Sequence, residues 1–562
     1  MLSRRDFLQV SAAAATLMSG LQPLGRQAAA QAITQDSLLE FEALGNVTLL
    51  HITDIHAQLV PLYFREPSIN LGVGELAGVP PHLTGMDFLE RYNIKEKSPK
   101  AYALSSTDFT ELARSYGRVG GVDRLATLIK AIRSEREGKT LFMDGGDTWQ
   151  GSYSSLQTGG EDMVRVMNLL GPEAMTAHWE FTYGQDRVME LLEQVEFDFL
   201  CGNVRDTLWD EKVFDAISYY DRGGVKVAVI GQAFPYTPIA NPRYLIPDWS
   251  FGIREEDVQA HIDEARAEGA QLVVLLSHNG FDVDRKLTSR VQGLDVVLTG
   301  HTHDALPAVE MVGKTLLVAS GSHGKFLSRL DLDVGPEGVK DFNYRLIPVF
   351  SDVIQPDAEM AALVEEVRAP FKSEIERELG TTDSLLYRRG NFNGTFDDLI
   401  CQALLQERDA EIALSPGFRW GATLLPGQAI TVDDVFTQTS ITYPNAYRQQ
   451  MKGEFLKTIL EDVADNLFNP DPYYQQGGDM VRVGGMGYRI DINKPIGSRI
   501  SDMTLLKTGE PIDPARDYTV AGWASVNEGT EGPPVYDVVT QYIEKQGSVS
   551  VPPNQSVKIV GA

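Results

Sequence analysis

Short apolar runs rich in β-branched residues alternate with amphipathic helical patterns along the first part of the chain. Apolar runs bounded by Gly, Asp or His are typical of buried strands in an α/β fold. The expected strands are Val47–Ile52, Thr140–Met143, Phe197–Leu200, Val225–Ile230, Leu272–Leu276, Val296–Leu298 and Thr315–Ala319. The expected helices include Val122–Ile132, Asp186–Val195 and Glu255–Ala267. This alternation predicts an α/β domain over residues 45–350.

The pattern changes at two places. Residues 64–116 carry Pro, Gly and polar clusters, which predicts an insertion over one end of the sheet. Residues 356–380 are charged and helix-favouring with few breakers, so they predict a linker helix. Beyond it, helical patterns at Phe396–Gln406 and Gly453–Asn466 and strand-like runs after Met480 predict a second domain over residues 385–562.

The first 32 residues have the pattern of an export signal. Arg4 and Arg5 precede Phe7 and Leu8, an apolar run follows, and small residues end at Ala32. The paired arginines resemble a twin-arginine signal, which exports proteins already folded. A membrane anchor is disfavoured because the run is shorter than the ~20 residues of a spanning helix. We therefore expect a soluble periplasmic protein, exported folded by the twin-arginine machinery, with no membrane insertion.

Composition and charge narrow the classes of partner. The chain has 562 residues, of which 43% are apolar, and carries 50 Lys and Arg against 78 Asp and Glu, a net charge of −28. That deficit argues against a nucleic-acid groove or an anionic membrane surface, because both require a basic face. The two cysteines exclude a disulfide scaffold and a cysteine-ligated zinc module.

Aspartates and histidines stand where the expected strands end. In open α/β sheets, binding sites form beyond the carboxyl ends of the strands. Taken singly, each segment is compatible with ordinary turn chemistry. The pair His301 and His303 is more specific, because positions i and i+2 of an extended segment aim both imidazoles at one place. The polar residues after the expected strands are Asp54, His56, Asp147, His278, His301 and His303.

The order of these segments resembles a known superfamily. Asp-x-His, Gly-Asp, a His segment, Ser-His and Gly-His-x-His follow one another as in the calcineurin-like metallophosphoesterases, in their 5′-nucleotidase branch. The resemblance covers most of the chain, because the second domain is similar to that branch's C-terminal substrate domain. It implies a metallophosphoesterase-type β-sandwich flanked by helices, joined by a linker helix to a 5′-nucleotidase-type C-terminal α/β domain.

The resemblance also implies two metal sites that share Asp147. Position by position, one site would consist of Asp54, His56, Asp147 and His303. The other would consist of Asp147, His178, His278 and His301. Carboxylate and imidazole ligands suit Mn, Fe or Zn and discriminate poorly among them. Two metals about 3.5–4 Å apart can hold a hydroxide and stabilise an in-line displacement.

One stretch departs from the nucleotidase pattern. Where that branch has Gly-Asn-His-Glu-Phe-Asp, this chain has Ala-His-Trp-Glu-Phe-Thr at 177–182. His178 takes the metal position, while Trp179 and Thr182 replace the catalytic His-Asp dyad. An alkoxide leaving group needs that dyad, whereas a thiolate, with a parent pKa of about 8.5, needs far less help. We therefore expect a better leaving group than a phosphate monoester has, with Trp179 as a substrate-side wall or as core packing.

Four segments (51–59, 145–152, 178–181 and 202–206) resemble the SoxB family of thiosulfohydrolases from bacterial thiosulfate oxidation. The resemblance implies two Mn²⁺ ions and attack of a metal-bound hydroxide on a cysteine S-thiosulfonate, with release of sulfate. The substrate would be carried by the protein SoxYZ. The segment at 415–421 matches the Gly-Gly-Ile-Arg segment of the nucleotidases, which makes Arg419 the candidate clamp on the sulfonate. A surface ion pair is the alternative role of Arg419.

Three functions stay open at this point. The first is the thiosulfohydrolase, with Asp147, Arg419 and Trp179 as the catalytic candidates. The second is a periplasmic 5′-nucleotidase or phosphodiesterase, which the absent dyad disfavours. The third is a non-catalytic metal-binding adaptor, which the complete ligand set disfavours. The other histidines match no ligand position and are expected to be ordinary structural residues: His51, His82, His261 and His323.

Overall fold

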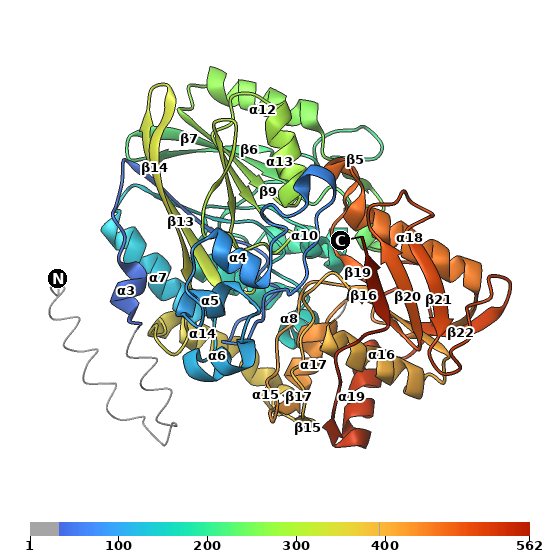
Figure 1. Cartoon of the computed structure of the whole chain (residues 1–562). Helices are drawn as coiled ribbons and strands as arrows, with labels where there is room; N and C mark the ends of the chain where they lie inside the picture. Colours follow the sequence, from blue (N-terminus) through green and yellow to red (C-terminus); the bar gives the residue numbers. More distant parts are fainter. Residues whose placement is uncertain (1–32, 393, 562) are drawn as a thin grey trace, which may run out of the picture.

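The computed structural model describes residues 33–392 and 394–561, which form two α/β bodies packed side by side (Figure 1). The export signal expected over residues 1–32 lies outside the described residues. Within the described ranges, no helix combines the length and the hydrophobicity that crossing a membrane requires.

The first body is a sandwich of two six-stranded sheets. One sheet has the order β14 (Gly338–Pro348), β13 (Phe326–Gly335), β1 (Val47–Ile52), β2 (Thr140–Asp144), β3 (Ala174–Met175) and β4 (Asp198–Phe199). The other has the order β11 (Glu310–Val312), β12 (Thr315–Ala319), β10 (Val296–Thr299), β9 (Leu272–Ser277), β7 (Val225–Gln232) and β6 (Ile217–Arg222). A separate short pair is formed by β5 (Arg205–Asp206) and β8 (Trp249–Ser250).

Alternation of side chains along the strands explains this sandwich. Leu49 of β1 and Val274 of β9 belong to an apolar cluster between the sheets, and Leu50 and Leu275, one position on, belong to the cluster on the outer faces. Central strands buried on both faces read as continuous apolar runs, which is why they were recognisable in the sequence. Helices α12 (Glu255–Ala267) and α13 (Phe281–Arg290) pack against the second sheet.

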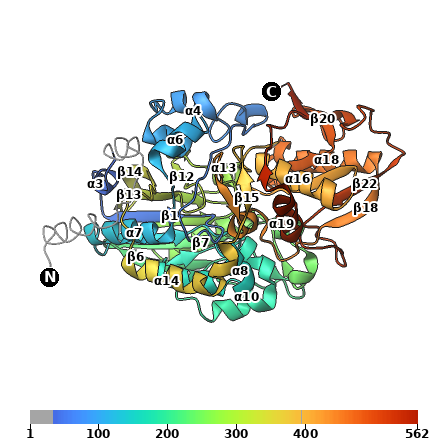
Figure 2. The ribbon, with the colours of Figure 1, turned by 90° about the horizontal axis from the view of Figure 1, so that it is seen from below.

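The remaining helices of the first body surround the sandwich (Figure 2). The expected insertion at 64–116 contains short helices and no strand among its residues. The helices are α3 (Gln35–Leu39), η1 (Gly74–Leu76), α4 (Gly85–Arg91), α5 (Pro99–Leu104), α6 (Phe109–Tyr116), α7 (Val122–Glu135), α8 (Tyr153–Thr158), α9 (Glu161–Leu170), η2 (Trp179–Tyr183), α10 (Gln185–Leu192), α11 (Thr237–Ala240) and η3 (Arg243–Leu245).

The connection between the bodies is helical but shorter than the linker helix expected over 356–380. It consists of α14 (Ala358–Arg368), η4 (Ala369–Phe371) and α15 (Lys372–Ile375). Pro370 lies in η4, where its missing N–H does not support a continuous α-helix. The residues from Glu378 onward form a strand instead, because they pair with two strands of the second body.

The second body contains three small sheets. Their orders are β17 (Ala429–Thr431), β15 (Glu378–Thr382), β23 (Ser548–Val549); β18 (Tyr447–Lys452), β22 (Asp517–Gly522), β16 (Ile412–Gly417), β19 (Asp479–Gly484); and β21 (Ile500–Leu505), β20 (Met486–Asp491), β24 (Val557–Val560). Its helices are α16 (Thr395–Glu407), α17 (Val432–Thr439), α18 (Gly453–Phe468), η5 (Pro472–Tyr474) and α19 (Val535–Gln546).

Part of the insertion joins the two bodies. Val73 is buried in the apolar cluster of the second body, together with Phe392 and Leu414. The backbone N–H of Leu71 donates to Asn391 Oδ1 at 2.6 Å, and the N–H of Asn391 donates to the carbonyl of Ile69 at 3.2 Å. The segment therefore lies across the boundary between the bodies, next to the site described below.

Candidate metal centre

Loops at the carboxyl ends of five strands meet at one place. The residues predicted from the sequence follow β1, β2, β3, β9 and β10, and all seven are buried, with at most 8% of any residue exposed. Their ligand atoms form two groups in which all atoms lie within 4.8 Å of one another. The groups are Asp54, His56, Asp147, His303 and Asp147, His178, His278, His301. Asp147 belongs to both.

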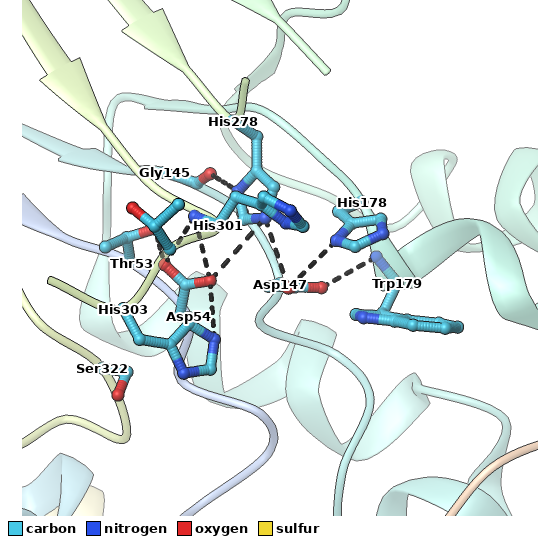
Figure 3. A network of polar contacts seen from close by, with 12 residues as sticks. Thr53, Asp54, Gly145, Asp147, His178, Trp179, His278, His301, His303 and Ser322 are labelled. Atoms are coloured by element: carbon cyan, nitrogen blue, oxygen red, sulfur yellow. Dashed lines mark hydrogen bonds and ion pairs between the residues drawn. The ribbon is translucent and has the colours of Figure 1, made fainter. Parts of the chain in front are cut away.

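The side chains point toward one another (Figure 3). His303 Nε2 lies 3.1 Å from Asp54 Oδ1 and 3.1 Å from His56 Nε2. On the other side of Asp147, its Oδ2 lies 3.1 Å from His178 Nδ1 and 3.2 Å from His278 Nε2. Donors and acceptors thus converge on two points that share one carboxylate.

The backbone of these loops is strained. Five of the seven residues adopt the left-handed conformation: Asp54 (φ 53°), His56 (φ 49°), Asp147 (φ 60°), His301 (φ 74°) and His303 (φ 58°). A non-glycine residue in that region costs of order 1–3 kcal/mol, and such residues cluster at functional sites. The left-handed backbone conformation directs the side chains of neighbouring residues into the same small volume.

Two glycines allow the loops to approach closely. A Cβ on Gly300 would lie 2.5 Å from Thr53 Oγ1 and 2.8 Å from His278 Nδ1. A Cβ on Gly146, whose φ is +87°, would lie 2.7 Å from the carbonyl oxygen of Thr176. The Gly-Asp and Gly-His patterns of the sequence therefore reflect steric requirements next to the ligand positions.

The hydrogen bonds of the imidazoles fit bound cations. A carbonyl oxygen only accepts, so His278 Nδ1–H donates to Gly145 O at 2.6 Å and leaves Nε2 directed at Asp147. In the same way His301 Nε2–H donates to Gln476 O at 3.2 Å, and His301 Nδ1 has no hydrogen-bond partner in the described chain. Such outer hydrogen bonds orient metal-binding histidines. The two groups fit a dinuclear metal centre.

Burial controls the protonation of the group. It lowers the pKa of His178 to about 4 and holds the pKa values of His301 and His303 well below their usual range. Neutral imidazole is the form that binds metals. Burial opposes ionisation of Asp147, but His178, His56 and His278 together hold the pKa of this carboxyl well below its usual range. Burial opposes protonation of His278, but the charges of Asp54 and Asp147 raise the pKa of His278 to about 9. Asp147 is therefore a charged ligand candidate, and His278 must release a proton when a metal binds.

Glu180 supports both sides of this centre, although no pattern in the sequence marks it for this role. The side chain is fully buried. Its Oε1 accepts from the backbone N–H of Thr148 at 2.6 Å and of Trp149 at 3.1 Å. Its Oε2 accepts from the N–H of His178 at 2.7 Å and of Asp147 at 3.3 Å. One carboxylate thus fixes the loops that carry Asp147 and His178.

Replacing Glu180 with glutamine should weaken both folding and metal binding. The amide has one acceptor oxygen, so N–H groups that now meet Oε1 or Oε2 would face an NH₂ group and stay unpaired, at about 1–3 kcal/mol each. We expect a lower free energy of unfolding in denaturant titrations and a metal affinity reduced about 10–100-fold.

The matched control for this variant is Glu461→Gln. Glu461 is a buried glutamate of the second body that accepts three backbone N–H groups, at 2.7 to 3.2 Å. This control should lose stability but keep its metal affinity. Equal metal affinities of the Glu180 variant and the wild type would contradict the positioning role.

Arg419 reaches the metal residues from the second body. Its Nη2–H donates to the carbonyl of Gly478 at 2.7 Å, and its Nε lies 3.6 Å from Asp479 Oδ1. Among the described residues, its Nε and Nη1 have no hydrogen-bond partner. Together with His301, Arg419 lines a cavity of about 50 Å³. The guanidinium is therefore available to an anion in that cavity.

A second arginine, Arg389, lies near Arg419 and was not predicted from the sequence. It is 5% exposed, its Nε has no hydrogen-bond partner among the described residues, and it lines a smaller cavity with His303 and Asp304. Its charge contributes to lowering the pKa of His303, after burial and His56. The adjacent Arg388 is instead bound to Asp397 at 2.7 Å. Arg388 and Arg389 are adjacent in the sequence, and no pattern there indicates which of them has a carboxylate partner among the described residues.

Trp179 lies between the centre and the second body. Its backbone N–H donates to Asp147 Oδ1 at 2.9 Å. Its indole is 5% exposed and makes edge contacts with Trp420 and Phe418, at ring distances of 5.1 and 5.5 Å. Thr182, which replaces the acid of the nucleotidase dyad, lies 2.7 Å from the hydroxyl of Thr442. Trp179 is therefore packed in an aromatic cluster, and its role toward substrate stays a prediction.

Two of the histidines expected to be ordinary lie close to the centre. The ring of His323 is 5.5 Å from that of His56, and its Nε2 accepts the N–H of Gly421 at 3.2 Å. His82 binds Asp282 at 2.6 Å and lines the cavity with Arg419. His323 matches no ligand position, yet it links a loop of the second body to the metal residues.

Comparisons with known proteins agree with this architecture. Residues 378–541 match the family model of the 5′-nucleotidase C-terminal domain. The chain is 25% identical to rat (Rattus norvegicus) 5′-nucleotidase over 76% of this chain and 81% of the rat protein. The structure of the sulfate thiohydrolase SoxB from Thermus thermophilus aligns with a TM-score of 0.90 and 38% identity, over 93% of this chain and 98% of that one. A 5′-nucleotidase precursor of Thermus thermophilus aligns with a TM-score of 0.72 and 20% identity, over 92% and 100%.

The fold and the site define a metal-dependent hydrolase of the two-domain 5′-nucleotidase type, which confirms the fold class expected from the sequence. Within that class, the 38% identity to SoxB of Thermus thermophilus, over 93% of this chain and 98% of that one, identifies the family. The chain belongs to the SoxB family.

Proposed function

We propose that this protein is a thiosulfohydrolase that releases sulfate from a cysteine S-thiosulfonate carried by the protein SoxYZ. In the reaction, the oxygen of a water forms a bond with the sulfonate sulfur. The S–S bond between the sulfonate sulfur and the adjacent sulfane sulfur breaks, the persulfide left on the carrier takes the electron pair, and the two protons of the water are released as sulfate forms. The observation that carries the proposal is the pair of arginines, the buried Arg389 and the partly buried Arg419, beside the two groups of metal-binding side chains.

The small cavity supports a small charged group as substrate. Pockets that enclose drug-sized molecules measure about 300–1,000 Å³. The cavity lined by Arg419 and His301 measures about 50 Å³, which is room for only a few water molecules. A sulfonate at the end of a narrow tether suits such a space better than a nucleoside does.

The residues around Trp179 favour a substrate whose leaving group needs no proton donor. Trp179 occupies the position of the catalytic histidine of the nucleotidases, and its indole offers no proton to an alkoxide. Thr182 contacts the hydroxyl of Thr442 rather than an imidazole. A thiol with a pKa of about 8.5 or below leaves without a proton donor. The persulfide of the proposed reaction is such a leaving group.

We propose Mn²⁺ for both groups, with Fe or Zn as alternatives, because oxygen and imidazole ligands suit all three. When bound, the metals would lower the pKa of a water and stabilise the charge that develops on the attacked group. Asp147 and the neutral histidines would hold the metals, and the arginines would orient the sulfonate oxygens. We also propose export of the folded chain to the periplasm through the twin-arginine signal at residues 1–32.

One experiment separates this function from its alternatives. The protein is loaded with Mn²⁺ and offered a panel of 5′-nucleotides and SoxYZ carrying a cysteine S-thiosulfonate, and the release of phosphate and sulfate is measured. We expect sulfate from the carrier and little phosphate, with a chelator-treated sample as the control. Phosphate release from nucleotides at the faster rate would favour a periplasmic 5′-nucleotidase, and no release from either would favour a metal-binding adaptor.

A further inference from the structure

A segment of the second body, residues 469–478, extends onto the first body. Asp471 contacts Lys286 of α13 at 2.5 Å, and the same ammonium lies 3.9 Å from the centre of the Tyr473 ring. The hydroxyl of Tyr473 donates to Glu255 at 2.7 Å, and that of Tyr236 donates to the carbonyl of Tyr473. The first part of the segment is therefore attached to α12, α13 and the loop before α11.

The second part of the segment ends at the candidate metal centre. The carbonyl of Gln476 accepts from His301 Nε2, and the carbonyl of Gly478, two residues on, accepts from Arg419 Nη2. Gln475 and Gly477 line the cavity between these two side chains. One short loop thus contacts a metal-binding residue of the first body and the anion-binding candidate of the second.

Gly477 makes this approach possible. Its φ is +74°, a conformation that favours glycine, and a Cβ at this position would lie 2.1 Å from His301 Nε2. The imidazole and the loop backbone are therefore in direct contact, with no room for a methyl group between them. A side chain here would have to displace either the ring of His301 or the loop.

We propose that residues 475–478 form a positioning loop that sets the ring orientation of His301 and the direction of the Arg419 guanidinium together. The inference rests on the proposed function in that it takes His301 as a metal ligand. The Gln476 carbonyl holds the proton of His301 on Nε2, which leaves Nδ1 for the metal. The second body thereby orients a metal ligand of the first body. The metal group formed by Asp147, His178, His278 and His301 therefore depends on both bodies.

The test is the variant Gly477→Ala, with Gly509→Ala as its control. Gly509 has nearly the same backbone conformation, φ +72°, but no atom within 4 Å of an added Cβ. The control therefore carries the backbone strain without the contact to His301. We expect wild-type protein and control to bind two Mn²⁺ per chain, measured by metal analysis after dialysis and by titration with Mn²⁺ alone. Gly477→Ala should keep one tight ion and bind the other about 10–100-fold more weakly.

A second variant, at Lys286, tests the same role in case Gly477→Ala does not fold. Lys286→Met keeps the length of the side chain but removes both the ion pair with Asp471 and the contact with Tyr473. It should weaken the second Mn²⁺ in the same direction, by a smaller factor, with an unchanged far-ultraviolet spectrum. Two tight ions in both variants would overturn the positioning role. A wild type that binds no pair of ions would instead overturn the proposed metal centre itself, so the two failures are distinguishable.

Discussion

Replacement of Asp147 by asparagine should abolish turnover while the protein remains folded. Asp147 is the one residue common to both groups, and asparagine keeps the shape and an oxygen that can accept the N–H of Trp179. Loss of the shared negative charge should weaken both metals at once. Since the metals contribute several kcal/mol of charge stabilisation, we expect sulfate release to fall at least about 10³-fold. Metal content and initial rates measure the two effects.

The matched control for this variant is Asp162→Asn. Asp162 is an equally buried aspartate on α9, 2% exposed against 1% for Asp147, and it accepts from Thr158 and Met163 rather than facing the centre. This control should bind metal and turn over as the wild type does. Full activity of the Asp147 variant with two bound metals would refute the site.

Replacement of Arg419 or Arg389 by lysine should impair catalysis without loss of metal. A guanidinium offers a planar fork of donors to an oxyanion, and an ammonium does not reproduce that geometry. Removal of one donor to a developing oxyanion typically lowers kcat about 10²–10³-fold. We expect losses of this size in kcat/KM for each single variant and a non-additive loss for the double variant, because both would contact the same group.

Steady-state kinetics on the loaded carrier protein test the arginines, and Arg499→Lys is the control. Arg499 is also buried, 2% exposed, but it is bound to Asp465 and to the carbonyl of Phe468 in the second body. Its replacement should affect stability and leave kcat/KM unchanged. If both site variants kept the wild-type kcat/KM, substrate binding by the two arginines would be excluded.

The central strands of the sandwich were predictable from the sequence. β1 and β12 have the bounds expected from their apolar runs, and α12 has those of its helical pattern. β13 was missed because its buried positions include ion-paired residues, and β14 was missed because most of its positions are not buried. Arg329 of β13 is fully buried against Asp331 and Glu135, so no continuous apolar run marks the strand. Hydrophobic patterning does not detect a core residue whose charge is neutralised by a partner far along the chain.

The metal-binding residues of the candidate site were predictable because their order along the sequence is itself a recognisable pattern. The seven residues of the two metal groups stand directly after strands, in an order that resembles one superfamily. Glu180 and His323 act through backbone N–H groups, and such contacts leave no pattern in the sequence. Among the described residues, Arg388 has a carboxylate partner and Arg389 has none, and this difference depends on the position of Asp397 in the fold. The domain boundaries at 45–350 and 385–562 stay predictions.

The left-handed backbone at five of the metal-binding positions has a consequence for the entropy of metal binding. Ordering a residue into a single backbone well opposes association by about 1–2 kcal/mol when it happens on binding. Here the buried surroundings hold these residues in place during folding, so a metal meets side chains whose freedom is already lost. The free energy of each metal–ligand bond then contributes to metal affinity, because little of it is offset by the entropy cost of ordering the loops. The same rigidity restricts the geometry that an ion must accept in order to bind.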